Sequence, residues 1–175
     1  SASIALMPVF FAAFGGAQWD WGPTIWVIAL VTMLLGSLVA IAQTDVKRML
    51  AYSSVAHAGF LLVGFVGAYV GAERITSISS VLFYLAVYGV ASIGAFAIVT
   101  LIRDAGGEAT HLSRWAGLGK ESPLLAGSFA LFMLSFAGIP LTAGFIGKWS
   151  VFSAAWSGGY AALVVAAGVV SGIAA

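Results

Sequence analysis

The sequence predicts an all-α, polytopic membrane helix bundle that contains one discontinuous helix. Of its 175 residues, 62% are hydrophobic and only 7% are charged, whereas an average soluble domain carries roughly 25% charged residues. Apolar runs of helical length recur along the chain, without the ten-residue alternation of a membrane barrel. Helices follow because lipid offers no hydrogen bonds to backbone amides.

Six apolar stretches have, or nearly have, the roughly 20 residues that a spanning helix needs. They lie at about residues 3–14, 23–42, 48–70, 77–102, 122–156 and 159–175. The first has neither an initiator Met nor the basic residues of a signal peptide, so we interpret it as the second half of a helix. We therefore expect residues 1–175 to form a single transmembrane domain that is an excerpt of a longer polytopic protein.

The composition excludes several classes of protein. Seven Lys+Arg and six Asp+Glu give a net charge of +1, which neither covers a soluble domain nor forms a basic surface for nucleic acid. Cysteine is absent, which excludes disulfides, thiol catalysis and thiolate-bound metal clusters on this chain. The sequence has no phosphate loop, dinucleotide fingerprint or His-Glu-x-x-His motif. We expect no cofactor and no metal on this chain.

The positions of Lys and Arg predict the orientation in the membrane. If each stretch crosses once, the loops on one side carry five cations and those on the other side carry only Arg74. The five are Lys47, Arg48, Arg103, Arg114 and Lys120. By the positive-inside rule, we expect these loops in the cytoplasm and a multi-pass protein of the cell (inner) membrane.

A histidine lies deep in the 48–70 stretch. His57 is about 14 Å along the helix from Arg48, which places it near the middle of a hydrocarbon core roughly 30 Å thick. Ser53 and Ser54 precede it by four and three residues and therefore share its face. Because histidine titrates near neutrality, this cluster suits a proton relay. The alternative is a neutral histidine that bridges two helices by hydrogen bonds.

The 77–102 stretch carries a polar stripe with a spacing of four residues, formed by Ser80, Tyr84, Tyr88 and Ser92. The stripe lines a hydrated path or provides interhelical hydrogen bonds, and we favour the second interpretation. In the loop that follows, Glu108 and His111 are not accompanied by further residues of metal-binding type, so we interpret both side chains as solvated.

The 122–156 stretch is too long for one helix. Its thirty-five residues would extend roughly 52 Å as a continuous helix. Pro140 at its centre removes a backbone donor and clashes with the preceding turn, while Gly138 and Gly144 permit unwinding. We predict two half-helices with a break near residues 138–144, and broken helices are typical of transporters.

Lys148 follows this break and is the only Lys or Arg well inside an apolar stretch. A buried lysine can gain and lose a proton as its neighbours change, which predicts a proton-carrying role. The alternative is an interfacial lysine that reaches the membrane surface beside Trp149 and Trp156. The apolar residues 151–155 that follow argue against that alternative.

Two motifs resemble a known family. Residues 43–60 read Gln-Thr-Asp-Val-Lys-Arg-Met-Leu-Ala-Tyr-Ser-Ser-Val-Ala-His-Ala-Gly-Phe. They resemble a segment shared by antiporter-like membrane subunits of respiratory NADH-quinone oxidoreductase (complex I) and of multisubunit cation/proton antiporters. Residues 134–148 read Leu-Ser-Phe-Ala-Gly-Ile-Pro-Leu-Thr-Ala-Gly-Phe-Ile-Gly-Lys. They resemble the subunit N branch more narrowly, as does Ser-Ile-Gly-Ala-Phe at 92–96; the sister subunit M typically has glutamate in place of Lys148.

The resemblance implies a fold of fourteen helices, of which this chain would hold the eighth through thirteenth, with the broken helix as the twelfth. It implies that Lys148 belongs to a row of charges that translocates protons and that His57 lies on the same polar axis. It also implies that the chain has other membrane subunits as partners and that protons and water are its transported species. It places NADH, FMN, Fe–S clusters and quinone on other subunits. The family's first-half glutamate–lysine pair has no counterpart here, and Pro8 stands where relatives tend to carry a basic residue.

These observations predict a proton-translocating membrane subunit that couples quinone reduction to proton pumping. Lys148 and His57 would carry the protons, with Ser53, Ser54 and Tyr88 in support. One alternative is a subunit of a cation/proton antiporter, and a second is a structural scaffold in which the helices only pack their neighbours. The resemblance further implies that this half of the subunit holds the exit part of a proton path.

Overall fold

The computed structural model describes residues 9, 18–70, 74–104, 107–157 and 159–173. The helix expected over residues 3–14 lies outside the described residues, except for Val9. The helical elements are α2 (Gln18–Ile41), α3 (Val46–Val70), α4 (Arg74–Leu101), η2 (Leu112–Trp115), α5 (Leu118–Glu121), α6 (Pro123–Ala137), α7 (Ala143–Ser157) and α8 (Ala161–Ile173). Two short strands, β1 (Arg103–Asp104) and β2 (Gly107–Glu108), pair antiparallel.

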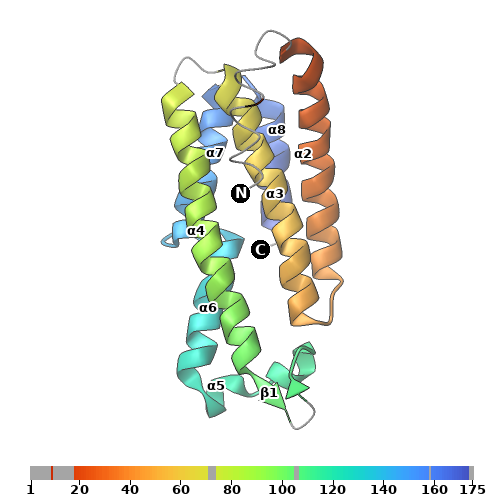
Figure 1. Cartoon of the computed structure of the whole chain (residues 1–175), viewed down its shortest axis with the longest axis vertical. Helices are drawn as coiled ribbons and strands as arrows, with labels where there is room; N and C mark the ends of the chain where they lie inside the picture. Colours follow the sequence, from red (N-terminus) through yellow and green to blue (C-terminus); the bar gives the residue numbers. More distant parts are fainter. Residues whose placement is uncertain (1–8, 10–17, 71–73, 105–106, 158, 174–175) are drawn as a thin grey trace.

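The all-α membrane bundle is confirmed. Among the described residues, three helices are long and apolar enough to cross a membrane, with spans at Trp21–Ile41, Val46–Val66 and Ser79–Leu101. The half-helices α6 and α7 are each too short to span alone, but they lie in the lower and upper parts of the bundle and meet near mid-height (Figure 1).

The bundle is assembled around α3, which packs against α2, α4 and α7. In lipid, apolar burial drives helix association weakly, so close packing and interhelical hydrogen bonds hold the helices together. The helices α2 and α3 approach closely at Gly36, where an added Cβ would lie 2.5 Å from the backbone nitrogen of Ala56. This approach brings the neighbouring Ser37 against the site described below.

The two ends of the bundle differ. At one end lie the α2–α3 turn, the β1–β2 hairpin and α5 (Figure 1). The first turn of α3 and the elements β1, η2 and α5 carry the five cations Lys47, Arg48, Arg103, Arg114 and Lys120. We call this the cation-rich end. At the opposite end α7 turns into α8, and the larger buried apolar cluster joins residues of α2, α3, α4, α7 and α8.

Candidate functional site

The predicted discontinuity is present, because α6 ends at Ala137 and α7 begins at Ala143. Gly138 has a φ of 77°, a left-handed conformation that glycine adopts without strain. The N–H of Ile139 donates to the Leu134 carbonyl at 3.2 Å, and the N–H of Gly138 donates to the Ser135 carbonyl at 3.1 Å. This is the hydrogen bonding of a Schellman turn, which ends a helix cleanly.

The start of α7 is held against the end of α6. After Pro140, Leu141 has a φ of 80°, and the chain reverses into α7. The N–H of Gly144 donates to the Ser135 hydroxyl at 3.1 Å, so a side chain of α6 caps α7. A Cβ on Gly144 would lie 1.8 Å from the Ser135 carbonyl oxygen. Only glycine permits this approach, so the two glycines that predicted the break, Gly138 and Gly144, each have a structural role in it.

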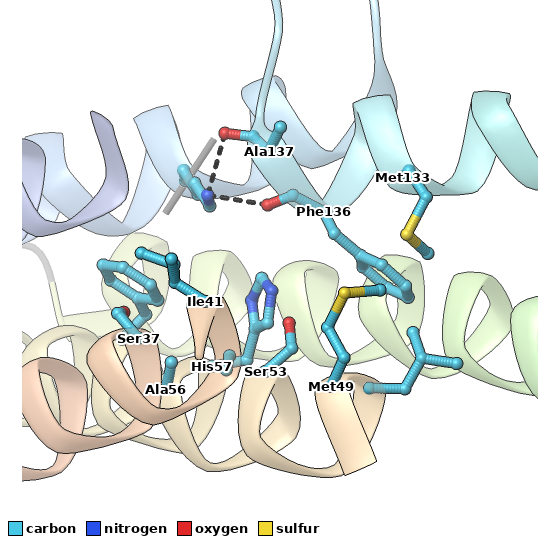
Figure 2. Close-up of a pocket in the computed structure, with 13 residues that line it drawn as sticks. Ser37, Ile41, Met49, Ser53, Ala56, His57, Met133, Phe136 and Ala137 are labelled. Carbon is cyan, nitrogen blue, oxygen red and sulfur yellow. Dashed lines mark hydrogen bonds between the residues drawn. The ribbon is translucent and has the colours of Figure 1, made fainter. Parts of the chain in front are cut away.

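Lys148 completes the hydrogen bonding of the α6 C-terminus. A helix leaves its last four carbonyls without partners inside the helix, and the turn at Gly138 satisfies the first two. Lys148 Nζ donates to the remaining two, at 2.8 Å to Phe136 O and 3.1 Å to Ala137 O; both carbonyls are labelled in Figure 2. A third bond of 2.7 Å reaches the Ser171 hydroxyl on α8. The break therefore creates the acceptors that a buried ammonium group needs.

Lys148 lies in the interior of the bundle. It is only 7% exposed, and its Nζ is 5.2 Å from the centre of the Phe60 ring, within cation–π range. Among the described residues no carboxylate pairs with it, so the negative end of α6 is what stabilises its charge. Trp149 and Trp156 are exposed instead. This geometry is that of a buried cation and differs from a lysine that reaches the membrane surface.

His57 is held by two tyrosines of α4. It is 5% exposed, and its Nδ1 shares a hydrogen bond with the Tyr84 hydroxyl. Tyr88 stacks on the imidazole ring, with 4.4 Å between the ring centres. The Phe136 ring lies across the site at 5.7 Å. Tyr84 therefore holds the imidazole at Nδ1, and no hydrogen bond to Nε2 is found among the described residues.

The two serines before His57 have different surroundings. Ser54 accepts a hydrogen bond of 2.7 Å from the Tyr88 hydroxyl and donates to Leu50 O at 2.9 Å. Ser53 lines a cavity (Figure 2). Within the α4 stripe, Tyr84 and Tyr88 form interhelical hydrogen bonds with His57 and Ser54. Ser92 Oγ is buried without a hydrogen-bond partner among the described residues.

Two cavities adjoin both Lys148 and His57. The larger, which we call the main cavity, has a volume of about 220 Å³, room for several waters at roughly 30 Å³ each. Besides these two residues, its polar lining is Ser37 and Ser53 (Figure 2). The smaller cavity has about 10 Å³, close to the least that holds one water. It is lined by Tyr84 and Ser135 as well as by both ionisable residues.

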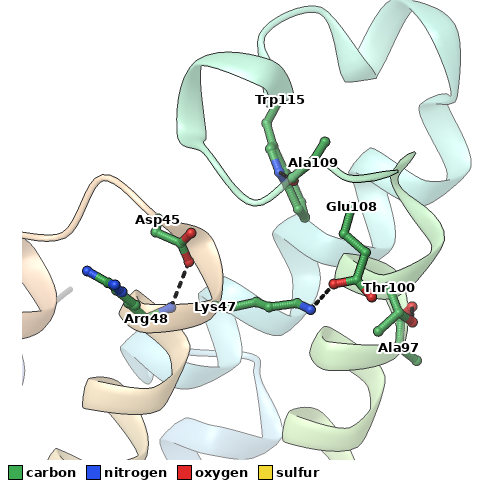
Figure 3. A network of polar contacts seen from close by, with 8 residues as sticks. All are labelled: Asp45, Lys47, Arg48, Ala97, Thr100, Glu108, Ala109 and Trp115. Carbon is green, nitrogen blue, oxygen red and sulfur yellow. Dashed lines mark hydrogen bonds and ion pairs between the residues drawn. The ribbon is translucent and has the colours of Figure 1, made fainter. Parts of the chain in front are cut away.

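Glu108 and His111 are exposed, as expected, and polar contacts join the elements of the cation-rich end. Lys47 forms an ion pair with Glu108, and Asp45 Oδ1 accepts a hydrogen bond of 3.0 Å from Arg48 N as the N-cap of α3 (Figure 3). His111 Nδ1 accepts from the N–H of Ser113 and begins η2. Backbone bonds of 2.8 and 2.9 Å tie the 110–112 segment to the α2–α3 turn. This end is thereby fixed relative to the start of α3.

Three residues of the site were not predicted from the sequence. They are Ser37, Tyr84 as the hydrogen-bond partner of His57, and Ser171. Ser171 is the only polar side chain in α8, and a lone hydroxyl in an otherwise apolar helix is a usable sequence signal. Which helix it faces depends on tertiary packing, and the sequence does not state that.

A bundle of membrane-length helices with one helix broken beside a buried lysine and histidine is typical of ion-transporting membrane proteins. Residues 1–174 match a family model described as "NADH:quinone oxidoreductase/Mrp antiporter, TM". The chain belongs to this family.

The similar proteins support the narrower resemblance to subunit N. The chain is 58% identical over 167 residues to NADH-quinone oxidoreductase subunit N of Nocardioides sp., covering 93% of this chain and 31% of the relative. It is 58% identical over 171 residues to NADH-quinone oxidoreductase subunit N 3 of Streptomyces griseus, covering 98% and 30%. The resemblance to subunit N is confirmed. The chain spans about a third of the length of these relatives.

Two solved structures share the fold. Respiratory complex I from Thermus thermophilus with bound aureothin matches with a TM-score of 0.74 and 32% identity, over 87% of this chain and 33% of that one. The Mrp complex from Dietzia sp. matches with a TM-score of 0.81 and 26% identity, over 99% and 31%.

Proposed function

We propose that this chain is part of a proton-translocating subunit of an NADH-quinone oxidoreductase, in which Lys148 carries the proton and His57 exchanges protons with it through water. Quinone reduction elsewhere in the complex would change the charge near the row of buried cations, and repulsion along that row would move protons. NADH, FMN, Fe–S clusters and quinone would be bound by other subunits. The protein would lie in the cell (inner) membrane among other membrane subunits, in contact with lipid.

The observation that carries this proposal is the hydrogen bonding of Lys148. As an ammonium group, Nζ donates to two carbonyls and to Ser171. A neutral amine has two N–H donors and one lone pair, so deprotonation releases one acceptor. Carbonyls cannot donate, but the Ser171 hydroxyl can rotate and donate to the lone pair. The site therefore has a set of hydrogen bonds for each protonation state.

The cavities that Lys148 shares with His57 also support the proposal. Both residues line the main cavity and the smaller one. A water in the smaller cavity would have several polar neighbours, which ordered buried waters require. With Nδ1 bound to Tyr84, the imidazole can accept a proton at Nε2 and pass it on after a change of tautomer.

The test separates a proton carrier from a structural anchor. Lys148→Ala removes the charge and three hydrogen bonds, whereas Lys148→Arg keeps donors and charge but does not release a proton at physiological pH. We expect NADH-driven acidification of inverted membrane vesicles to fall in both variants of the full-length subunit. NADH oxidation and assembled complex are recorded in the same samples, and Lys120→Ala on the exposed α5 is the matched control.

Normal acidification in Lys148→Arg together with a loss in Lys148→Ala would contradict the carrier role, because an anchor needs donors but not proton release. Normal acidification in both variants would leave the chain as a scaffold.

The second candidate is a subunit of a cation/proton antiporter, which the structural likeness to the Mrp complex favours. Sodium-dependent proton exchange by membranes that contain the full-length subunit, without any NADH oxidation, would support it. The 58% identity to subunit N relatives favours the first candidate.

A further inference from the structure

A further cavity lies on the outer side of the bundle, and we call it the lateral cavity. It has a volume of about 460 Å³ and is enclosed by α4, the second half of α6 and the link into α7. Its lining is apolar except for Ser135 and Thr142. Three of the lining residues, Val90, Leu131 and Leu141, are strongly exposed. The cavity is therefore open to the surroundings of the bundle.

The lateral cavity opens near the middle of the membrane. The membrane span of α4 covers Ser79–Leu101, so Val90 lies at its centre. Ala86, which also lines the cavity, is only about 6 Å from that centre along the helix. The facing wall ends at the break between α6 and α7, which lies near mid-height (Figure 1). Because the hydrocarbon core is roughly 30 Å thick, the opening lies at the depth of the acyl chains.

Packing and backbone geometry keep the lateral cavity open. The helices α4 and α6 already touch at Gly94, where an added Cβ would lie 2.4 Å from Phe132 Cζ. Close packing at this point prevents α6 from moving nearer to α4. At the break, Leu141 has a φ of 80°, a left-handed conformation in which leucine is strained. Its side chain is fully exposed and therefore does not fill the cavity.

The size and the chemistry of the lateral cavity indicate the class of its occupant. One turn of a helix with its side chains takes up roughly 500 Å³, so the cavity is too small for a neighbouring helix. The Ser135 hydroxyl already accepts a hydrogen bond from Gly144 N at 3.1 Å. The Thr142 hydroxyl already donates to Ile139 O at 2.7 Å. The occupant therefore needs no polar group.

Empty apolar space would be unfavourable here, because every side chain of the lining would lose dispersion contacts. The flexible apolar material available at this depth is the acyl chain of a bilayer lipid. We propose that the lateral cavity binds one acyl chain of a bilayer lipid, which forms the outer wall of the helix break.

The bound acyl chain lies directly behind the buried site. Val87, Ala91 and Ser135 line both the lateral cavity and the smaller cavity that Lys148 and His57 share. A single layer of side chains therefore separates the lipid from the site, and one member of this layer, Ser135, also caps α7. The lipid site does not depend on the proposed function, because it requires no proton transfer.

Photo-crosslinking from the lipid tests the proposal. The complex with the full-length subunit is reconstituted into vesicles of phosphatidylethanolamine and phosphatidylglycerol, in which a small fraction of the phosphatidylethanolamine carries a diazirine near the end of one acyl chain. After illumination, mass spectrometry maps the lipid adducts. Ala86→Phe places a ring inside the cavity. Ala97→Phe is the matched control, because Ala97 is exposed on the same face of α4, about three turns toward the cation-rich end and outside the cavity.

We expect lipid adducts at Val90, Leu131 and Leu141 in the wild type. In Ala86→Phe their yield should fall at least about fivefold, because a phenyl ring and an acyl chain cannot occupy the same close-packed space. Ala97→Phe should keep the wild-type yield. If Ala86→Phe does not assemble, Val90→Phe fills the same cavity, and the adducts are then measured at Leu131 and Leu141.

Absence of adducts at these three residues in the wild type would overturn the proposal and would indicate that protein covers the cavity. Equal yields in Ala86→Phe and Ala97→Phe would also overturn it, because they would indicate lipid that moves over the outer surface without entering. The outcome is independent of pumping. Adducts that Ala86→Phe abolishes, together with normal acidification in Lys148→Arg, would keep the lipid site and remove the carrier role, and the reverse combination would do the opposite.

Discussion

The tightest contact in the site predicts a strong effect of one added methyl group. In Gly144→Ala, the new Cβ would lie 1.8 Å from the Ser135 carbonyl oxygen and 2.9 Å from its hydroxyl oxygen. Because the obstacle is backbone, α6 and α7 must separate by more than about 1 Å to restore a normal contact. Overpacking costs about 1–3 kcal/mol, and loss of the bond from Gly144 N to Ser135 Oγ adds about 1 kcal/mol.

The better helix propensity of alanine offsets at most about 1 kcal/mol of this, so we expect a net destabilisation of about 1–3 kcal/mol. The separation also moves the carbonyls of Phe136 and Ala137 away from Lys148. Under the proposed function, we therefore expect less proton pumping per NADH oxidised.

Gly127→Ala is the matched control, because Gly127 lies inside α6 with no atom within 4 Å of its added Cβ. The assay compares the thermal stability of the purified complexes by scanning fluorimetry and their NADH-driven acidification in vesicles. If Gly144→Ala matched Gly127→Ala in both, the close approach of α6 and α7 would not be required for the site.

Two further predictions concern the hydrogen bonds around α3. Tyr84→Phe leaves His57 Nδ1 without its hydrogen-bond partner, which costs about 1–3 kcal/mol at a buried site. We expect several-fold slower acidification with a shifted pH profile, whereas Tyr88→Phe keeps that bond and shows no shift. Equal pH profiles of the two variants would refute the positioning role of Tyr84. A hydrogen bond from Thr110, followed by that from the backbone of Arg48, lowers the pKa of Asp45 below its ordinary value of 3.8. Its ionised form therefore stabilises the start of α3 above that value, and this stabilisation is lost as the pH falls through the lowered pKa. In the wild type, the amide hydrogen-exchange rate of the first turn of α3, corrected for intrinsic rates, should rise as the pH falls through the lowered pKa of Asp45. In Asp45→Asn, this dependence of the exchange rate on pH should disappear.

The helix bundle and its break were predictable because they depend on local physics. Membrane length, composition and the effects of Gly138 and Pro140 act within one segment, so the sequence states them without knowledge of its neighbours. The depth of His57 follows from the rise per residue in the same way. The predicted roles of Lys148 and His57 stay predictions, although the structure brings both residues to the same two cavities.

The remaining features depend on contacts between segments that are far apart in the sequence. Ser171 reaches Lys148 from 23 residues away, and Tyr84 reaches His57 from 27. Ser53 and Ser54 are adjacent and look equivalent in the sequence. One lines the cavity and the other holds Tyr88, because successive helix positions point about 100° apart. Similarly, nothing local to Glu108 indicates that its charge partner is Lys47.

The lysine and the helix break depend on each other. A continuous helix uses its carbonyls internally, so a lysine beside it would find no acceptors and would carry an uncompensated charge in the membrane. Conversely, a helix that ends at mid-membrane leaves carbonyls bare, and the turn at Gly138 satisfies only the first two of them. Lys148 takes the other two. Proton release from Lys148 would keep both carbonyl bonds but remove the positive charge at the C-terminus of α6. The protonation state of the site would thereby be coupled to the end of the half-helix.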